Sequence, residues 1–290
     1  MDNICITENF CLWEDLLGFG KPLYENNWDL TSEDVLKNII RLQQLEDETL
    51  NISNAFIEKV FTLNDGFVRI FDIPQNSVMM LLMWFENSIL SFQRLNRLDL
   101  ANGFYGVRGV LAYGKRAIYS CKRSVGLGEY IQTSPQRKAE YNKTKVVNAP
   151  SELQMNMAFS KAYIIENSGK ARGVKGNHLF IDIEVLEKLC DIINNIGFDK
   201  IGLTTSDEEE NGALYYNYKA ELISDKSIFK FNVHANTGKY NWCCFSISFD
   251  NFIEYSNEPV AIQTKLLVPA NMLSAYTSPH EDRHDYYDLN

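Results

Sequence analysis

The chain has 290 residues, a formal net charge of −10 and a hydrophobic fraction of 45%. This length accommodates one large domain or one domain with an appendage, and the apolar content excludes a disordered chain. The acidic balance argues against general affinity for nucleic acid or for anionic membranes. The longest apolar run, Val78 to Phe85, is too short to span a bilayer, and the first residues lack the pattern of a signal peptide. Six scattered cysteines without a C-x-x-C pair predict reduced thiols, so we expect a cytoplasmic protein.

The N-terminal half alternates predicted strands and helices. Ser32 suits a helix N-cap, and Val35, Leu36, Ile39, Ile40 and Leu42 recur after it at helical spacing. The turn Asn64-Asp65-Gly66 between two runs rich in Val, Phe and Ile predicts a β-hairpin. In chain order we expect a strand at 8–13, a helix from Ser32, strands at 55–63 and 67–73, a helix at 75–96 with an apolar core stripe, and a strand at 105–113.

The C-terminal half begins with a polar, poorly periodic stretch at 116–150, which predicts a long loop. A helix at 152–166, a strand at 178–183, a helix at 185–196, an acidic turn at 207–212 and a strand from Tyr215 follow. Strands that alternate with helices but include adjacent hairpin strands predict the α+β class. We expect a mixed or antiparallel sheet with helices packed on one face.

Basic residues gather in one part of this acidic chain. They are Lys115, Arg116, Lys122, Arg123, Arg137, Lys138, Lys143 and Lys145, against only two glutamates in the same segment. One interpretation is a solvated surface loop. The other is a positive rim over a polyphosphate site.

Two aspartates stand out by their place in the predicted sheet. Asp15 follows the first strand, and Asp65 lies at the tip of the hairpin. If these strands are neighbours, both carboxylates point at one site, where a cation would relieve their mutual repulsion. Hard oxygen ligands suit Mg²⁺ or Mn²⁺, which hold nucleotide phosphates through one or two carboxylates. The alternative is that Asp65 serves only the turn.

The sequence around both aspartates resembles the class III nucleotidyl cyclases. Asp15-Leu-Leu-Gly-Phe19 is similar to the D-x-x-G-F segment that carries the first metal ligand of that family, and Asn64-Asp65-Gly66 is similar to the hairpin with the second. Val107 to Gly114 resembles the strand that follows in the family. The three motifs occur in the order of the family.

A closer resemblance is to the pyrimidine cyclases of the bacterial Pycsar anti-phage systems. Arg108-Gly109-Val-Leu-Ala-Tyr-Gly114 resembles their R-G-x-I-x-x-G strand, and Ala162-Tyr163-Ile-Ile-Glu166 resembles the A-Y-x-x-E end of a helix. Short segments at 211–218 and 239–242 are also similar. The resemblance consists of short, scattered segments between Phe10 and about Trp242, and it implies a catalytic domain at 8–224. Residues 225–290 would be a C-terminal extension that could pack on the same domain.

The resemblance implies a ferredoxin-like catalytic core that acts as a head-to-tail homodimer with shared active sites. UTP or CTP would be cyclised to a 3′,5′-cyclic monophosphate with release of pyrophosphate, as a second messenger read by a downstream effector in anti-phage defence. Asp15, Leu16 and Asp65 would hold two divalent ions, Mn²⁺ or Mg²⁺.

The expected base contacts depart from those of purine-using relatives. Those relatives carry a base-reading lysine four residues before the second metal aspartate, where this chain has Phe61. An aromatic residue there fits a different base. Tyr113 and Tyr163 are candidates for stacking on a base, with core packing as the alternative.

The transition-state arginine of the family has no counterpart at its usual position. The family places Asn and Arg one helical turn apart, whereas here Asn156 is followed four residues later by Ser160. Arg108 and Lys161 are the candidate catalytic substitutes, and Lys115 is a candidate substrate contact.

Three functions therefore stay open from the sequence. The first is a metal-dependent pyrimidine nucleotide cyclase, and the second is a catalytically silent cyclase-like module that binds a nucleotide or a partner. The third is a polymerase-like palm, which would also use paired strand aspartates. The choice between UTP and CTP, the activating signal and the role of 225–290 are not decided by the sequence.

Overall fold

The computed structural model describes residues 4–53, 57–74, 77–118, 153–169, 174–201, 214–225, 228–236, 241–249, 251–255 and 258–262. Its helices are α1 (Gly20–Glu25), α2 (Glu33–Ile52), α3 (Val78–Ala101), α6 (Met157–Ser168) and α7 (Ile183–Ile196). Its strands are β1 (Cys5–Leu16), β2 (Lys59–Leu63), β3 (Gly66–Asp72), β4 (Val107–Ile118), β5 (Leu179–Asp182), β6 (Phe198–Ile201), β7 (Leu214–Asp225), β8 (Ile228–Asn236), β9 (Asn241–Phe249), β10 (Asn251–Tyr255) and β11 (Glu258–Ile262).

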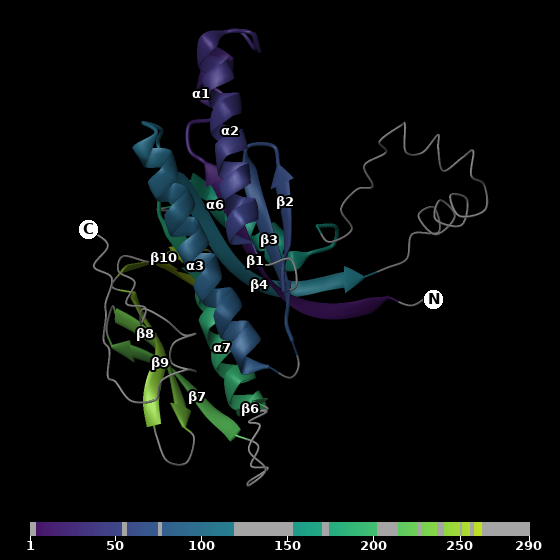
Figure 1. Ribbon diagram of the computed structural model, residues 1–290, viewed down its shortest axis with the longest axis vertical. Coiled ribbons are helices and arrows are strands. Elements are labelled where there is room, and N and C mark those ends of the chain that lie inside the picture. Colours follow the sequence, from purple (N-terminus) through teal and green to yellow (C-terminus); the bar gives the residue numbers. More distant parts are fainter. Residues whose placement is uncertain are drawn as a thin grey trace, which may run out of the picture.

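The strands form two sheets (Figure 1). The larger has the order β10-β11-β5-β4-β1-β3-β2, and the smaller has the order β6-β7-β8-β9. β1 is antiparallel to both of its neighbours, whereas β4 and β5 are parallel. The sheet is therefore mixed, and the expected α+β class is confirmed.

One face of the larger sheet is covered by α2, α3 and α7, and Figure 1 shows α2 and α3 in front of the strands. Alternate β1 residues, among them Phe10 and Leu12, point to this face and are fully buried. The ring of Trp84 on α3 stacks at 4.8 Å on Phe71 of β3 and at 5.4 Å on Phe10. Large buried aromatic rings therefore join α3 to the centre of the sheet.

The opposite face carries α6, which corrects the expectation of helices on one face only. Ala158 and Ala162 of α6 pack with Cys11 and Trp13, the β1 residues that alternate with the first set. Gly114 of β4 allows this approach, because a Cβ there would lie 2.4 Å from the backbone nitrogen of Ala158. The helix thus packs against strand backbone with no side chain between them.

The helix α2 buries only part of the set that its apolar spacing suggests: Val35 is buried and Leu42 packs against the core, but the other three residues do not. Leu36, Ile39 and Ile40 are between 38% and 52% exposed, whereas Asn38 and Arg41 are buried. Those two polar side chains face the loop after β1, where they donate hydrogen bonds to backbone carbonyls. The buried face of this helix therefore combines hydrogen bonds to backbone carbonyls with the apolar contacts of Val35 and Leu45.

Other boundaries shift by a few residues. β4 continues to Ile118, five residues beyond the expected end and into the expected loop. α6 begins at Met157 because Asn156 caps it, with its side-chain oxygen accepting from the nitrogen of Phe159 at 3.1 Å. The acidic turn at 207–212 and the basic residues beyond Arg116 lie outside the described residues.

The expected boundary between 224 and 225 falls at the end of β7, which pairs with β8 in the smaller sheet. β11, from the expected C-terminal extension, pairs with β5 in the larger sheet. The division into two parts stays a prediction. Within the described ranges, no helix has the length and apolar character needed to cross a membrane.

Candidate functional site

Asp15 and Asp65 lie together at one edge of the larger sheet. Asp15 is the penultimate residue of β1 and pairs in register with Gly66, the residue after Asp65. The backbone nitrogen of Leu16 donates to the carbonyl of Asp65 at 3.1 Å. Asn64 takes the left-handed conformation with φ 57° and donates its amide to the Asp65 carboxylate at 2.8 Å. The hairpin tip is therefore tied directly to the end of β1.

Gly66 permits this close approach of the two strands. A Cβ on Gly66 would lie 2.5 Å from the carbonyl oxygen of Glu14 and 2.6 Å from the ring of Trp13. The sequence suggested that this glycine serves the turn, but it lies inside β3, and the two-residue turn is Asn64-Asp65. The absence of a side chain at Gly66 instead allows β3 to lie close to β1.

Arg108 and Glu166 complete the charged cluster. Arg108 is the register partner of Asp15 on β4. Its guanidinium pairs with the Glu166 carboxylate of α6 at 2.9 Å and donates to the carbonyl of Gly176 at 3.1 Å. Sequence reasoning gave Glu166 no role of its own, although it ends the A-Y-x-x-E pattern that pointed to this helix.

The electrostatic environment of Asp15 is unfavourable to its charge. Burial, followed by the nearby carboxylates of Glu166 and Asp65, raises the pKa of Asp15 to about 7, against the opposing effects of Arg108 and Arg41. A bound cation would reverse this penalty, because an opposite charge favours the ionised carboxylate. The site is therefore electrostatically suited to a positive ligand.

The donor set fits a hard divalent ion. Asp15 and Asp65 supply carboxylate oxygens, and the carbonyl oxygen of Leu16, which accepts from the nitrogen of Phe19 at 3.2 Å, has two lone pairs and is a further candidate ligand. Among the described residues, no cluster of three or more His, Cys, Asp or Glu side chains could hold a metal. Two carboxylates with waters and substrate phosphates are nevertheless the usual environment of Mg²⁺.

Two of the predicted base contacts lie on the same face of the sheet as Asp15. Phe61 and Trp13 both pair with Val68, so they flank it in one row across three strands. Tyr163 of α6 lies 6.0 Å from the ring of Trp13, and it is 45% exposed. Tyr163 therefore presents an accessible aromatic ring beside Trp13, which lies two residues before Asp15 on β1.

The other three predicted residues lie at the far end of β4. Tyr113 donates its hydroxyl to Glu8 at 2.6 Å, and Lys161 pairs with Asp182 and Glu184 at 2.5 and 2.8 Å. Together with Lys115, they line a pocket of about 460 Å³ whose other walls are Gly114, Met157, Ser160, Ile164 and Glu184.

Within one chain, these pocket residues do not meet the charged residues at the edge of the sheet. Lys115 is seven residues along β4 from Arg108, a strand distance of about 23 Å. The helix α6 spans the gap, with Ala158 packed at the pocket end and Glu166 at the charged edge. Asp15, Asp65, Arg108 and Tyr163 therefore lie in one region of the protein, and Lys115 lies in another.

No protein-family model matches the chain, and no curated protein sequence matches it. Among solved structures, the guanylyl cyclase Cya2 is similar at 13% identity, covering 90% of this chain and 92% of its own, with a TM-score of 0.36. The guanylyl cyclase domain of the RhoGC fusion protein of Blastocladiella emersonii is similar at 12% identity, covering 71% and 93%, with a TM-score of 0.35. The guanylate cyclase domain of RhGC from Catenaria anguillulae, in complex with GTP, is similar at 11% identity, covering 72% and 93%, with a TM-score of 0.36. The likeness is too distant to transfer an activity, a substrate or a ligand to this chain.

Proposed function

We propose that the protein is a nucleotidyl cyclase that converts a pyrimidine nucleoside triphosphate, UTP or CTP, to its 3′,5′-cyclic monophosphate. The observation that carries the proposal is the meeting of Asp15 and Asp65 at one sheet edge, with Arg108 opposite Asp15. These residues belong to the three motifs that resemble class III cyclases. Their proximity is what that chemistry requires.

In the reaction the ribose 3′-oxygen forms a bond to the α-phosphorus, and the bond from that phosphorus to the bridging oxygen of the β-phosphate breaks. Pyrophosphate leaves, and the hydroxyl proton passes to solvent. Asp15 and Asp65, with the carbonyl of Leu16, would hold two Mn²⁺ or Mg²⁺ ions, which neutralise phosphate charge and favour the alkoxide when bound. Arg108 forms a 2.9 Å ion pair with the adjacent Glu166 and so offsets part of the charge of that carboxylate.

The proposed base preference rests on the aromatic residues. Phe61 occupies the position at which purine-using relatives of the resembled family carry a base-reading lysine. Tyr163 offers a partly exposed ring beside Trp13, on the face that carries Asp15. Stacking on such a ring is open to any base, so the ring by itself does not select one. The proposed pyrimidine preference therefore rests on Phe61, which cannot make the purine contact of that lysine.

A homodimer would supply what one chain lacks. The pocket with Tyr113, Lys115 and Lys161 is about 23 Å along β4 from the carboxylates. In a head-to-tail pair, the pocket end of one copy can face the acidic edge of the other, so each site is shared. The resemblance to the Pycsar cyclases further suggests a second messenger for anti-phage defence, read by a separate effector protein.

The test is incubation of the full chain with Mn²⁺ and each of the four ribonucleoside triphosphates, with product identified by mass spectrometry. We expect a cyclic mononucleotide from UTP or CTP, and none from Asp15→Asn or Asp65→Asn. Asp29→Asn is the matched control, because Asp29 is an exposed turn residue whose carboxylate accepts hydrogen bonds from Thr31. Product from either site variant at the wild-type rate would refute the assignment of the site, and a product with several nucleotides would indicate a polymerase-like activity.

One observation favours a second candidate, a silent module that binds nucleotide without turnover. Ser160 stands at the position of the transition-state arginine of the resembled family, and it donates its hydroxyl to the carbonyl of Asn156 at 2.9 Å. Lys161 beside it is engaged by Asp182 and Glu184. Triphosphate binding by calorimetry without pyrophosphate release would identify this alternative.

A further inference from the structure

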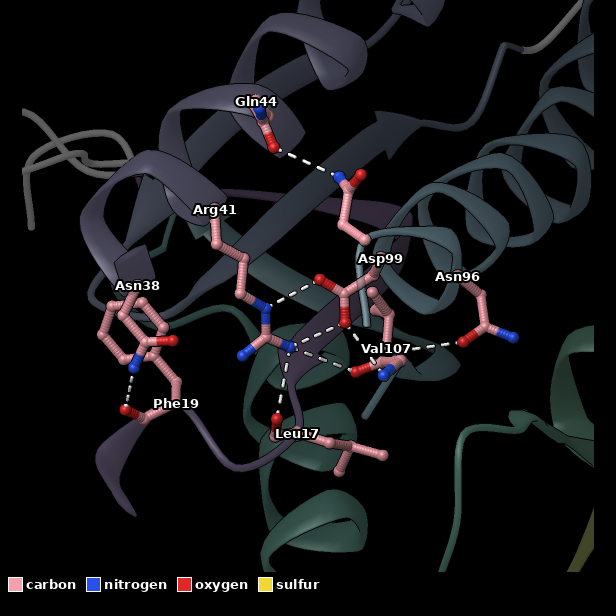
Figure 2. A network of polar contacts seen from close by, with 10 residues as sticks. Leu17, Phe19, Asn38, Arg41, Gln44, Asn96, Asp99 and Val107 are labelled. Carbon is pink, nitrogen blue, oxygen red and sulfur yellow. Dashed lines mark hydrogen bonds and ion pairs between the residues drawn. The ribbon is translucent and has the colours of Figure 1, made fainter. Parts of the chain in front are cut away.

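A buried ion pair lies directly behind the charged edge. Arg41 of α2 donates to both carboxylate oxygens of Asp99 on α3, at 2.7 and 2.8 Å, and the two side chains are 1% and 0% exposed. The ring of Phe104 lies 4.7 Å from the guanidinium carbon. Figure 2 shows the pair between the two helices, with the loop after β1 beneath it.

The pair binds the two backbone segments that adjoin the site. Arg41 donates to the carbonyl of Leu17 at 3.2 Å and to that of Gly106 at 3.4 Å. Asp99 accepts from the nitrogen of Gly106 at 2.8 Å. Leu17 lies two residues after Asp15, and Gly106 lies two residues before Arg108.

A neighbouring contact holds the same loop. Asn38, on the buried face of α2, donates its amide to the carbonyl of Phe19 at 2.6 Å. The two segments are also bonded to each other, since the nitrogen of Leu17 donates to the carbonyl of Gly106 at 3.1 Å. The loop is thus bonded directly to α2 and to Gly106, the residue before β4, while Asp99 of α3 holds both Arg41 and Gly106.

Such a pair is poor evidence for a role in stability alone. Desolvating two charges costs about as much as their attraction returns, and apolar replacements are often neutral. The fork of Arg41 instead fixes directions, because its planar donors bind a carboxylate and carbonyls at set angles. What the pair determines is the placement of the segments it touches.

We propose that Arg41 and Asp99 are positioning residues that set the placement of Asp15 and Arg108 for metal binding and catalysis. The inference rests on the proposed function. Neither residue is a proposed metal ligand, and both contact the backbone of the segments that carry Asp15 and Arg108, at Leu17 and Gly106. Groups that orient metal ligands in this way typically change metal affinity or activity by about 10–100-fold when they are altered.

Three variants test the proposal. Arg41→Lys keeps the charge but loses the fork, and Arg41→Met with Asp99→Leu removes the pair without leaving a buried charge. Lys37→Met is the matched control, because Lys37 lies one turn earlier on α2 and makes only exposed ion pairs. Each full-length chain is measured well below its own melting midpoint for Mn²⁺ binding without nucleotide, by electron paramagnetic resonance, and for kcat and KM.

We expect Arg41→Lys and the double variant to lose about tenfold or more in Mn²⁺ affinity and in kcat. The KM for the nucleotide should stay nearly unchanged in both variants. Lys37→Met should behave like the wild type. Wild-type Mn²⁺ affinity and kcat in a folded double variant would overturn the positioning role, even if Arg41→Lys failed to fold. In that case Asp15→Asn would still abolish product, and the proposed function would stand. A wild-type chain that makes no product, and whose Mn²⁺ binding is unaffected by Asp15→Asn, would refute both proposals together.

Discussion

Replacing Gly66 by alanine tests how closely the hairpin must approach β1 to bring the two aspartates together. The added Cβ would lie 2.5 Å from the carbonyl oxygen of Glu14, about 0.9 Å short of the 3.4 Å at which ordinary contact begins. The Trp13 ring, at 2.6 Å, blocks movement on the other side. Neither atom belongs to a flexible side-chain end, so β3 has to move away from β1.

The expected cost follows from this overpacking. Extra methyl groups forced into well-packed positions destabilise by about 1–3 kcal/mol. For a chain of this size each kcal/mol corresponds to about 2–4 °C in Tm, so we expect a fall of about 2–12 °C. The displaced β3 also carries the hairpin tip, so product formation should fall more than the loss of folded protein explains.

The assay is thermal unfolding followed by circular dichroism, with product formation measured at low temperature. Gly20→Ala is the matched control, because no atom lies within 4 Å of a Cβ at Gly20 and its backbone is not left-handed. That variant should be neutral or slightly stabilising, since alanine reduces the entropy of the unfolded chain. A Tm for Gly66→Ala equal to that of Gly20→Ala would refute the reasoning.

Two further predictions concern buried charges. Arg69→Met should lower the free energy of unfolding in urea by about 3–5 kcal/mol. The reason is that the buried carboxylates of Glu14 and Glu58 lose the arginine with which they pair at 3.3 and 2.8 Å. A decrease below about 1 kcal/mol would contradict this reasoning. Burial raises the pKa of Glu86 to about 7 from its ordinary 4.5, so the folded chain holds this proton more tightly than the unfolded chain, and stability falls as the pH rises through that interval. Glu86→Gln should therefore raise the Tm at pH 8 but not at pH 4, and equal shifts at both pH values would show that the carboxyl does not titrate in this way.

Local signals in the sequence were sufficient for most elements. The alternation in β1, the Asn64-Asp65 turn and the position of Ser32 before α2 each depend on neighbours within a few residues. Because these preferences act over one turn or one strand pair, they can be read without knowledge of the rest of the chain. The same signals made Asp15 and Asp65 candidates for one site.

The tertiary structure decided what depends on register and on contacts between distant segments. Arg41 and Asp99 are 58 residues apart, and no local pattern predicts that they meet behind Leu17. The strand register pairs Arg108 with Asp15, and it pairs Lys115 with Glu8 at the other end of β1. A side chain's face and its neighbours across a sheet are set by long-range pairing, which hydrophobic periodicity leaves undetermined.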